Sequence, residues 1–132
     1  MKVIGVCGYA GSGKDAFASF LPHFHRLAFA DALKRYAMQM FDLSWDQCYG
    51  TVEQKETVDP RWGITPRLVL QVLGTEVARS IHPDAWLEHW RRDAEALQQG
   101  VSWQYEEGRW TQLNVFPKTR NVVVPDVRFP NE

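Results

Sequence analysis

Hydrophobic positions along this 132-residue chain fall into runs that predict short strands alternating with helices. Residues 3–7 form an apolar run typical of a buried strand, and residues 16–21 are typical of a helix. A second strand is expected at about residues 26–29. A third is expected at 121–125, where three valines are consecutive. Strands separated by helices predict an α/β protein with a parallel sheet.

Capping residues and helical spacing predict further helices between the second and third strands. The expected helices are residues 32–41 capped by Asp31, residues 44–49 capped by Ser44, residues 66–81 capped by Thr65, and residues 85–99 capped by Asp84 and ended by Gly100. Residues 51–63 are polar and predict a loop with one helical turn. Residues 101–105 and 109–116 alternate on either side of a possible turn at residues 106–108, which predicts a β-hairpin.

A glycine-rich stretch lies between the first strand and the first helix. Residues 8–15 match the phosphate-binding pattern G-x-x-x-x-G-K-[ST] except at the last position, where Asp15 replaces the hydroxyl residue. Glycines let successive backbone N–H groups point into one concavity, and Lys14 supplies a full charge for β- and γ-phosphates. These features predict a phosphate site, because a purely structural glycine turn has no need of Lys14.

A row of polar residues lies along the helix expected at residues 66–81. Arg67, Gln71, Thr75 and Arg79 are spaced by four, so this polar row turns by about 40° at each step. Gly74 lies beside the row, where glycine costs about 1 kcal/mol relative to alanine, and this favours a close neighbour. The polar row suits an anionic ligand such as a nucleoside monophosphate, and it equally fits a solvated helix face.

The third strand ends in an acidic residue. Asp126 follows residues 121–125, which is the Walker-B arrangement, and Arg128 comes two residues later. Because the carboxyl ends of parallel strands gather around the ligand crevice, both side chains are expected near the phosphate site. We expect Asp126 to hold a Mg²⁺-bound water or to orient the acceptor.

Charge and cysteine content exclude several partners. The net charge of -1 and the pI of about 6.4 give no field that favours nucleic acid or membrane, so neither is an expected partner. No apolar run has the length of a membrane span, and the N-terminus does not resemble a signal peptide. Cys7 lies in the first expected strand and is expected to be a buried free thiol, which fits a cytoplasmic location.

Several stretches together resemble one family in order and spacing: residues 8–15, 29–34, 55–56, 65–67, 70–76, Arg79 and residues 126–132. The chain resembles the deoxynucleoside monophosphate kinases of tailed bacteriophages, whose P-loop ends in Gly-Lys-Asp. Leu-Gly-Thr-Glu at 73–76 and Asp-Val-Arg-Phe-Pro-Asn-Glu at 126–132 are more specific than the loop. Animal-type phosphomevalonate kinases are similar in their Ser-Gly-Lys-Asp loop and Asp-x-Arg strand end, so a small-metabolite kinase remains an alternative.

This resemblance implies ATP-dependent, in-line phosphorylation of deoxynucleoside 5′-monophosphates with ATP and Mg²⁺. It implies one P-loop kinase-like domain over residues 1–132, three-layered α/β with a parallel sheet. Residues 1–30 and 119–132 would form its core, 31–100 a helical acceptor-binding region, and 101–118 a hairpin excursion. A phage-encoded enzyme would act in the host cytoplasm, and the resemblance leaves a homodimer open.

The resemblance also implies roles for individual residues. ATP phosphates would be held by Gly8, Gly11, Ser12, Gly13, Lys14 and Asp15. The acceptor would be held by Lys34, Arg67, Gln71, Thr75, Arg79 and Arg128. The catalytic residues would be Lys14, Arg67, Arg79, Asp126 and Arg128, with Mg²⁺ held through water by Asp15 and Asp126.

Only three parallel strands can be read, fewer than the family's sheet contains. We therefore expect a C-terminally truncated domain, and a non-catalytic nucleotide-binding fragment is a further alternative.

Overall fold

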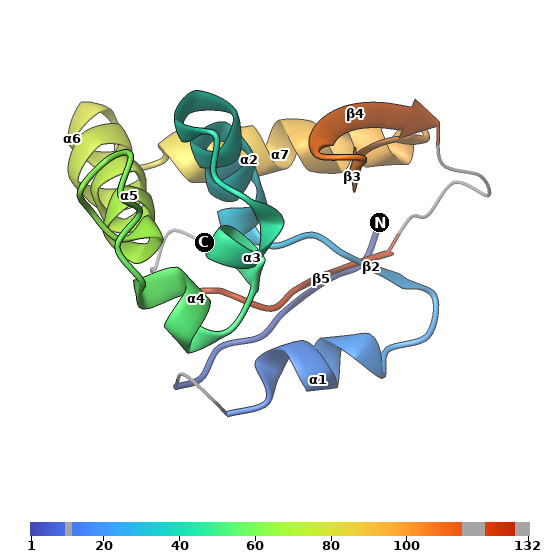
Figure 1. The fold of residues 1–132 in the computed structure, drawn as a ribbon. Coiled ribbons are helices and arrows are strands. Elements are labelled where there is room, and N and C mark those ends of the chain that lie inside the picture. Colours follow the sequence, from blue (N-terminus) through green and yellow to red (C-terminus); the bar gives the residue numbers. More distant parts are fainter. Residues whose placement is uncertain (10–11, 115–120, 129–132) are drawn as a thin grey trace. The chain divides into compact units, whose positions relative to one another are not determined.

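The computed structural model describes residues 1–9, 12–114 and 121–128, and it confirms a mixed α/β chain with a parallel sheet (Figure 1). The elements are β1 (Val3–Gly5), α1 (Lys14–Ser19), β2 (Phe24–Arg26), α2 (Phe29–Phe41), α3 (Trp45–Tyr49), α4 (Val52–Glu56), α5 (Pro66–Gln71), the π-helix η1 (Val72–Val77), α6 (Ala78–Ile81), α7 (Ala85–Gln98), β3 (Val101–Glu106), β4 (Arg109–Asn114) and β5 (Asn121–Val124). They form two compact units, Met1–Asp31 with Leu87–Glu132, and Ala32–Trp86. Most of α7, which the sequence analysis grouped with the acceptor region, falls in the first unit.

The first unit contains a parallel sheet in the order β1-β5-β2. Val3 pairs with Val122 on one side of β5, and Phe24 pairs with Asn121 on the other. The strand that is last in the chain is therefore the central one. Because the strands are parallel, the segments that follow β1, β2 and β5 all begin at one edge of the sheet.

The core of the first unit lies on β5. Val122, Val123 and Val124 have at most 2% of their surface exposed, as expected of a central strand covered on both faces. Val122 and Val124 join a cluster with Phe29 and the α7 residues Trp90, Ala94 and Leu97. Since side chains alternate along a strand, Val123 faces the opposite side. Figure 1 shows α7 and α1 on opposite sides of this sheet.

Several predicted boundaries are wrong: β1 ends at Gly5 rather than at residue 7, and α1 covers Lys14–Ser19 rather than residues 16–21. The second strand covers Phe24–Arg26 rather than residues 26–29, and α2 begins at Phe29 rather than at residue 32. Asp31 consequently lies in the first turn of α2, where its Oδ2 accepts a hydrogen bond from the Ala28 N–H at 2.9 Å. The start of α2 is capped from elsewhere in the chain, by Asp126.

The prediction for Cys7 is also wrong in part. Its thiol is free, as expected, but exposed, because β1 ends at Gly5 and Cys7 lies beyond the paired segment. Cys48 on α3 is the buried cysteine. A buried thiol therefore exists, but not in the strand where it was expected.

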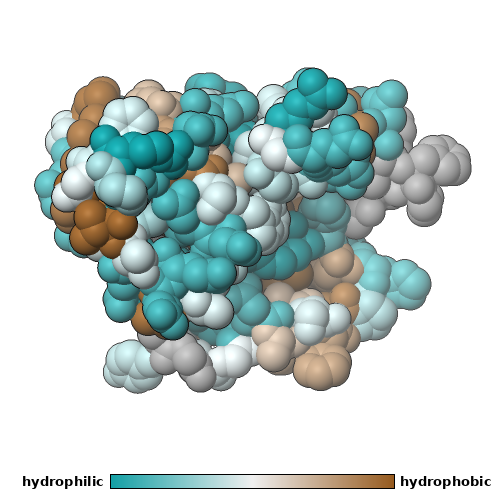
Figure 2. Space-filling model, viewed as in Figure 1, coloured by the Kyte–Doolittle hydropathy of each residue, from teal (hydrophilic) through white to brown (hydrophobic). Residues whose placement is uncertain are grey.

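Helix α1 packs through a small residue and exposes its large ones. Only Ala18 of this helix is buried. Phe17 and Phe20, at its end, are 52% and 81% exposed, and Figure 2 shows apolar side chains on the surface over α1. Among the described residues, no helix combines the length and apolar character needed to cross a bilayer.

The helices of the second unit begin where their capping residues predict. Ser44 and Thr51 each form a complete capping box, with Gln47 and Gln54 respectively, at the starts of α3 and α4. The Thr65 hydroxyl accepts the Leu68 N–H at 3.2 Å, and Pro66 occupies the first turn of α5. The predicted caps Ser44 and Thr65 and the helical turn within residues 51–63 are confirmed, whereas the cap at Thr51 was not predicted.

The hairpin prediction is confirmed for the described residues. Strands β3 and β4 pair antiparallel from Val101↔Asn114 to Glu106↔Arg109. Glu107 and Gly108 have φ values of 51° and 76°, the left-handed conformation that a tight two-residue hairpin turn requires. Residues 115–118 of the expected excursion lie outside the described residues.

Candidate functional site

The glycine-rich loop turns tightly before α1. A Cβ at Gly8 would lie 2.7 Å from the Ser12 Oγ, so a larger residue would push this hydroxyl away. Gly13 has φ +85°, a left-handed conformation that suits glycine, and α1 begins at the next residue. Gly11 lies outside the described residues. Both described positions therefore have a physical reason to be glycine.

Lys14 lies back across this loop. Its Nζ donates a hydrogen bond to the Gly8 carbonyl oxygen at 2.8 Å. This acceptor is neutral, and an anion at the loop would offer the ammonium a stronger, charge-assisted bond. The geometry makes Lys14 available to an incoming phosphate.

Asp15 contacts a residue that the sequence analysis missed. Its Oδ1 accepts hydrogen bonds from the Nε and one terminal nitrogen of Arg26, both at 3.3 Å. The other terminal nitrogen of Arg26 donates to both oxygens of Asp31 at 3.3 Å. Arg26 is the last residue of β2. The sequence feature that could have identified it is an arginine at the carboxyl end of a parallel strand, where functional groups gather.

Asp126 caps α2. Its Oδ1 accepts the Phe29 N–H and its Oδ2 the Ala30 N–H, each at 2.8 Å. Burial raises the pKa of Asp126 despite these two hydrogen bonds, which act in the opposite direction. Both carboxylate oxygens are thus engaged with backbone, an arrangement unsuited to direct coordination of Mg²⁺.

Metal-ligand geometry is limited elsewhere too. Within residues 1–9, 12–114 and 121–128, no three His, Cys, Asp or Glu side chains group as a metal site. Asp15 is 77% exposed and bonded to Arg26, so contact through water suits it better than a closed coordination shell. Arg128 is exposed two residues beyond Asp126.

The polar row occupies one continuous helical segment of the second unit. Arg67 and Gln71 lie on α5, Thr75 on η1 and Arg79 on α6. The Arg67 side chain forms an ion pair with Glu56 of α4 at 3.2 Å, and Gln71 and Thr75 are exposed. Arg79 is half-buried. The structure therefore places the row on a surface that a ligand could reach.

The π-helix alters the direction of this row. In an α-helix, residue i+4 lies about 40° past a full turn. A π turn bonds residue i to i+5 and takes more residues, so that residue i+4 falls short of a full turn. The π segment between Gln71 and Arg79 thus reverses the drift that an α-helix would give. The polar row is straighter than its sequence spacing predicts.

Gly74 has the close neighbour that the sequence analysis expected. A Cβ built on Gly74 would lie 2.6 Å from Cδ2 of Leu33 on α2. The Gly74 carbonyl oxygen also accepts a hydrogen bond from the Trp86 Nε1 at 2.8 Å. The glycine therefore permits close packing by Leu33 and presents a carbonyl to Trp86.

Lys34 lies against an aromatic ring in the second unit. Its Nζ is 4.3 Å from the centroid of the Tyr49 ring, a cation–π contact. Nearby, burial raises the pKa of Cys48 to about 11, although the charges of Lys34 and Lys55 act to lower it. Cys48 therefore remains a protonated thiol at neutral pH. The charge among Lys34, Tyr49 and Cys48 is carried by the Lys34 ammonium.

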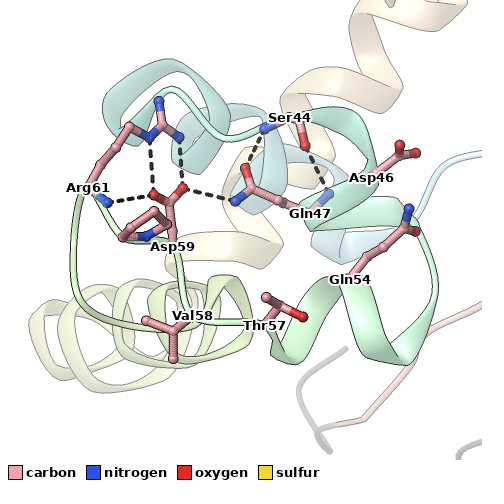
Figure 3. Close-up of a pocket in the computed structure, with 9 residues that line it drawn as sticks. Ser44, Asp46, Gln47, Gln54, Thr57, Val58, Asp59 and Arg61 are labelled. Atoms are coloured by element: carbon pink, nitrogen blue, oxygen red, sulfur yellow. Dashed lines mark hydrogen bonds and ion pairs between the residues drawn. The ribbon is translucent and has the colours of Figure 1, made fainter.

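A hollow of about 540 Å³ opens elsewhere in the second unit (Figure 3). The residues that line it are Ser44, Asp46, Gln47, Gln54, Thr57, Val58, Asp59, Pro60 and Arg61. No motif in the sequence indicates that any of them is a binding residue.

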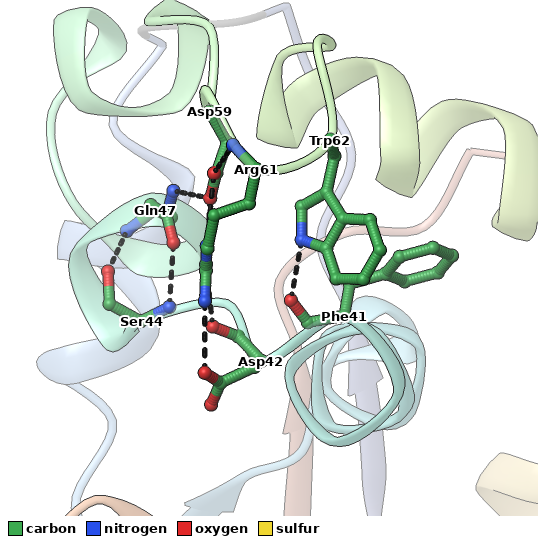
Figure 4. Close-up of polar contacts among 7 residues, drawn as sticks. All are labelled: Phe41, Asp42, Ser44, Gln47, Asp59, Arg61 and Trp62. Atoms are coloured by element: carbon green, nitrogen blue, oxygen red, sulfur yellow. Dashed lines mark hydrogen bonds and ion pairs between the residues drawn. The ribbon is translucent and has the colours of Figure 1, made fainter.

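The wall of this hollow is a network around Asp59 (Figure 4). Asp59 is 5% exposed and accepts hydrogen bonds from Arg61 at 2.8 and 3.1 Å and from Gln47 at 2.9 Å. The hydrogen bonds from Arg61, and then that from Gln47, lower the pKa of Asp59. Arg61 also binds Asp42 at 2.9 Å. These bonds fix the loop ahead of α5, so the network supports the helix that carries the polar row.

Taken by geometry, the first unit is a parallel α/β layer with a lysine-bearing glycine loop after its first strand, and the second presents a cationic helix face. Such a chain is suited to phosphorylated ligands.

The chain is similar to a mimivirus protein described as "Putative deoxynucleotide monophosphate kinase", from Acanthamoeba polyphaga mimivirus, with 38% identity over 144 aligned residues. The alignment covers 100% of this chain and 66% of the relative, so the chain spans about two thirds of that protein's length. No family model matches the chain. No solved structure matches it.

Proposed function

We propose that this chain belongs to an ATP-dependent nucleotide kinase that phosphorylates deoxynucleoside 5′-monophosphates. The observation that carries the proposal is Lys14, which follows the left-handed Gly13 and reaches back across the loop to the Gly8 carbonyl. The name of the mimivirus relative supports the same reaction class.

The donor nucleotide would bind at residues 8–15. An ATP phosphate would take the Nζ of Lys14 from the Gly8 carbonyl, because a charged acceptor binds an ammonium more strongly than a neutral one. Ser12 and the backbone of the glycine loop would supply further donors. Lys14 would then spread the charge that develops between the β- and γ-phosphates, and such positioning accounts for most catalysis of phosphoryl transfer.

Mg²⁺ bound to ATP would neutralise part of the phosphate charge. Asp15 fits this ion only through water, because the structure engages it with Arg26. Asp126 would act mainly by holding the start of α2, and Arg128 would lie at the same sheet edge.

The acceptor phosphate would bind the polar row. Arg67 and Glu56 are about half-exposed, and exposed ion pairs contribute only about 0–1 kcal/mol, so a phosphate could displace the glutamate. Gln71 and Thr75 would donate hydrogen bonds to the nucleotide, and Arg79 would hold the phosphate from the next turn. Lys34 would add a charge from α2.

A direct test compares Lys14→Ala with Lys2→Ala, which removes an exposed lysine outside the loop. Phosphoryl transfer from ATP is measured with each deoxynucleoside monophosphate and, separately, with phosphomevalonate. We expect transfer to at least one deoxynucleotide, its near-abolition in Lys14→Ala, and native activity in Lys2→Ala. Native turnover in Lys14→Ala, or transfer to phosphomevalonate alone, would overturn the proposal.

ATP binding, measured separately by calorimetry, distinguishes a kinase from a chain that binds nucleotides without catalysis. Binding that depends on Lys14 with no transfer to any acceptor would identify a nucleotide-binding chain without kinase activity. Transfer with full dependence on Lys14 would support the enzyme.

A second comparison tests the acceptor site. Glu56→Gln should release Arg67 and lower the KM for the acceptor, whereas Arg67→Gln should raise it, and kcat should change less than KM in Glu56→Gln. An unchanged KM in both variants would show that the polar row does not bind the acceptor.

A further inference from the structure

Asp15 poses an electrostatic problem for a phosphate site. It follows Lys14 at the position where the loop pattern has a hydroxyl residue, and its carboxylate is 77% exposed. A hydroxyl would donate a hydrogen bond to phosphate, but a carboxylate repels it. The charge of Lys14 is therefore offset by its own neighbour in sequence.

Arg26 neutralises the Asp15 carboxylate by direct contact. Three of its nitrogens are engaged: two donate to the Oδ1 of Asp15 and the third donates to Asp31, all at 3.3 Å. With Arg26 present, the side chains of Lys14, Asp15, Arg26 and Asp31 carry no net charge. Without Arg26, the same group would carry one negative charge.

The fold holds Arg26 in this position. It is the last residue of β2 and pairs with Val123 of β5, so its backbone is fixed at the sheet edge where the loop after β1 also begins. Asp31 is fixed in turn, because its Oδ2 accepts the Ala28 N–H at 2.9 Å. Arg26 is thus anchored through Asp31 and extends to Asp15.

We propose that Arg26 is a positioning residue of the phosphate site, which neutralises and orients Asp15 so that a polyphosphate can approach Lys14. This inference rests on the proposed function, since it presumes that a phosphate binds the loop. Arg26 need not touch the ligand; it acts through the charge and the direction of the Asp15 carboxylate.

The inference makes a prediction about charge that a purely structural role does not. Removing Arg26 leaves Asp15 unneutralised, so Arg26→Gln should weaken binding of tripolyphosphate by about tenfold. Asp15→Asn in the same chain removes the repulsion and returns the group to no net charge, so the double variant should bind within about twofold of the native chain. Arg26→Lys keeps the charge and should bind nearly as native.

The experiment uses calorimetry with the full chain and two probes, tripolyphosphate in EDTA and MgATP. Arg91→Gln is the matched control, because it removes another exposed arginine of the first unit, which pairs with Glu88 at 2.8 Å. Its affinity for both probes should equal that of the native chain. Asp15→Asn alone, which leaves Arg26 in place, should bind tripolyphosphate more tightly than native, and it keeps the test decisive if Arg26→Gln fails to fold.

Three results would overturn the inference while native binding is intact. One is an unchanged affinity in Arg26→Gln, and another is a double variant as weak as Arg26→Gln, which would indicate a structural role. The third is tighter MgATP binding by Arg26→Gln, which would mean that Arg26 competes with the metal for Asp15. Absence of binding by the native chain to either probe would overturn the proposed function as well.

Discussion

The Trp86 Nε1 donates a hydrogen bond to the Gly74 carbonyl oxygen at 2.8 Å, within the one π-helical segment of the described residues. Widened turns of this kind change the backbone hydrogen-bonding pattern and often occur at functional sites. Trp86 therefore does more than pack against the helix that carries the polar row, because it donates to a carbonyl inside that helix.

Replacing Trp86 by Phe should lower the free energy of unfolding by about 1–2 kcal/mol. An aromatic ring is kept, but the hydrogen bond to the carbonyl of the buried Gly74 is lost. Chemical denaturation measures the loss. Trp62→Phe is the control, since its Nε1 donates to the Phe41 carbonyl from a side chain that is 46% exposed. A loss no larger than that of Trp62→Phe would contradict the prediction.

Gly74→Ala should destabilise the chain by about 1 kcal/mol. Alanine favours a helix over glycine by about 1 kcal/mol, but its Cβ would lie 2.6 Å from Leu33, and overpacking costs about 1–3 kcal/mol. In a Leu33→Ala background the same substitution should become neutral or stabilising. The two values come from equilibrium unfolding of the four chains of this cycle. Equal effects in both backgrounds would show that Leu33 is not the obstacle.

Asp126→Ala should cost about 2 kcal/mol, the upper range for loss of a helix cap, because two backbone N–H groups lose their acceptors at once. Asp126→Asn keeps one acceptor oxygen and should cost less. Unfolding monitored by far-ultraviolet circular dichroism measures both. Glu95→Ala, an exposed change on α7, should be nearly neutral. If Asp126→Ala were equally neutral, the cap would not contribute to stability.

Stability should fall in acid because of Asp59. Its folded pKa is lowered by Arg61 and Gln47, so its contribution is present above the pKa of an unfolded aspartate, about 3.9, and is lost as pH falls toward the folded pKa. Thermal unfolding of native and Asp59→Asn chains across this pH range isolates the contribution of the Asp59 carboxylate to stability. The difference between them should shrink as pH falls below about 4. Asp126 has a raised pKa and acts in the opposite sense, but it is common to both chains.

Elements whose ends are set by nearby residues were predicted well from the sequence. Ser44 and Thr65 accept hydrogen bonds from N–H groups three residues ahead, and Gly100 adopts a left-handed φ of 82° just after α7. Such signals lie within one turn of the boundary they set. The three parallel strands were predicted for a related reason, because the valine run of β5 needs no distant information to be identified as buried.

Boundaries and contacts set by distant residues were not predicted. The cap of α2 comes from Asp126, far along the chain, so Asp31 was the only candidate that local reasoning could offer. The same limit applies to Arg26, whose partner Asp15 lies in another element. The π-helix also escaped prediction, since nothing in the spacing of residues 71–79 distinguishes a π turn from an α turn.

The central place of β5 has a consequence for how the chain folds during synthesis. β1 and β2 each pair with β5 rather than with one another, so the strands made first have no partner until residues 121–124 emerge. The sheet that orders the glycine loop is therefore closed only after the intervening helices have been made. Such long-range pairing slows folding, because the entropy of closing a large loop is lost before any strand contact compensates for it.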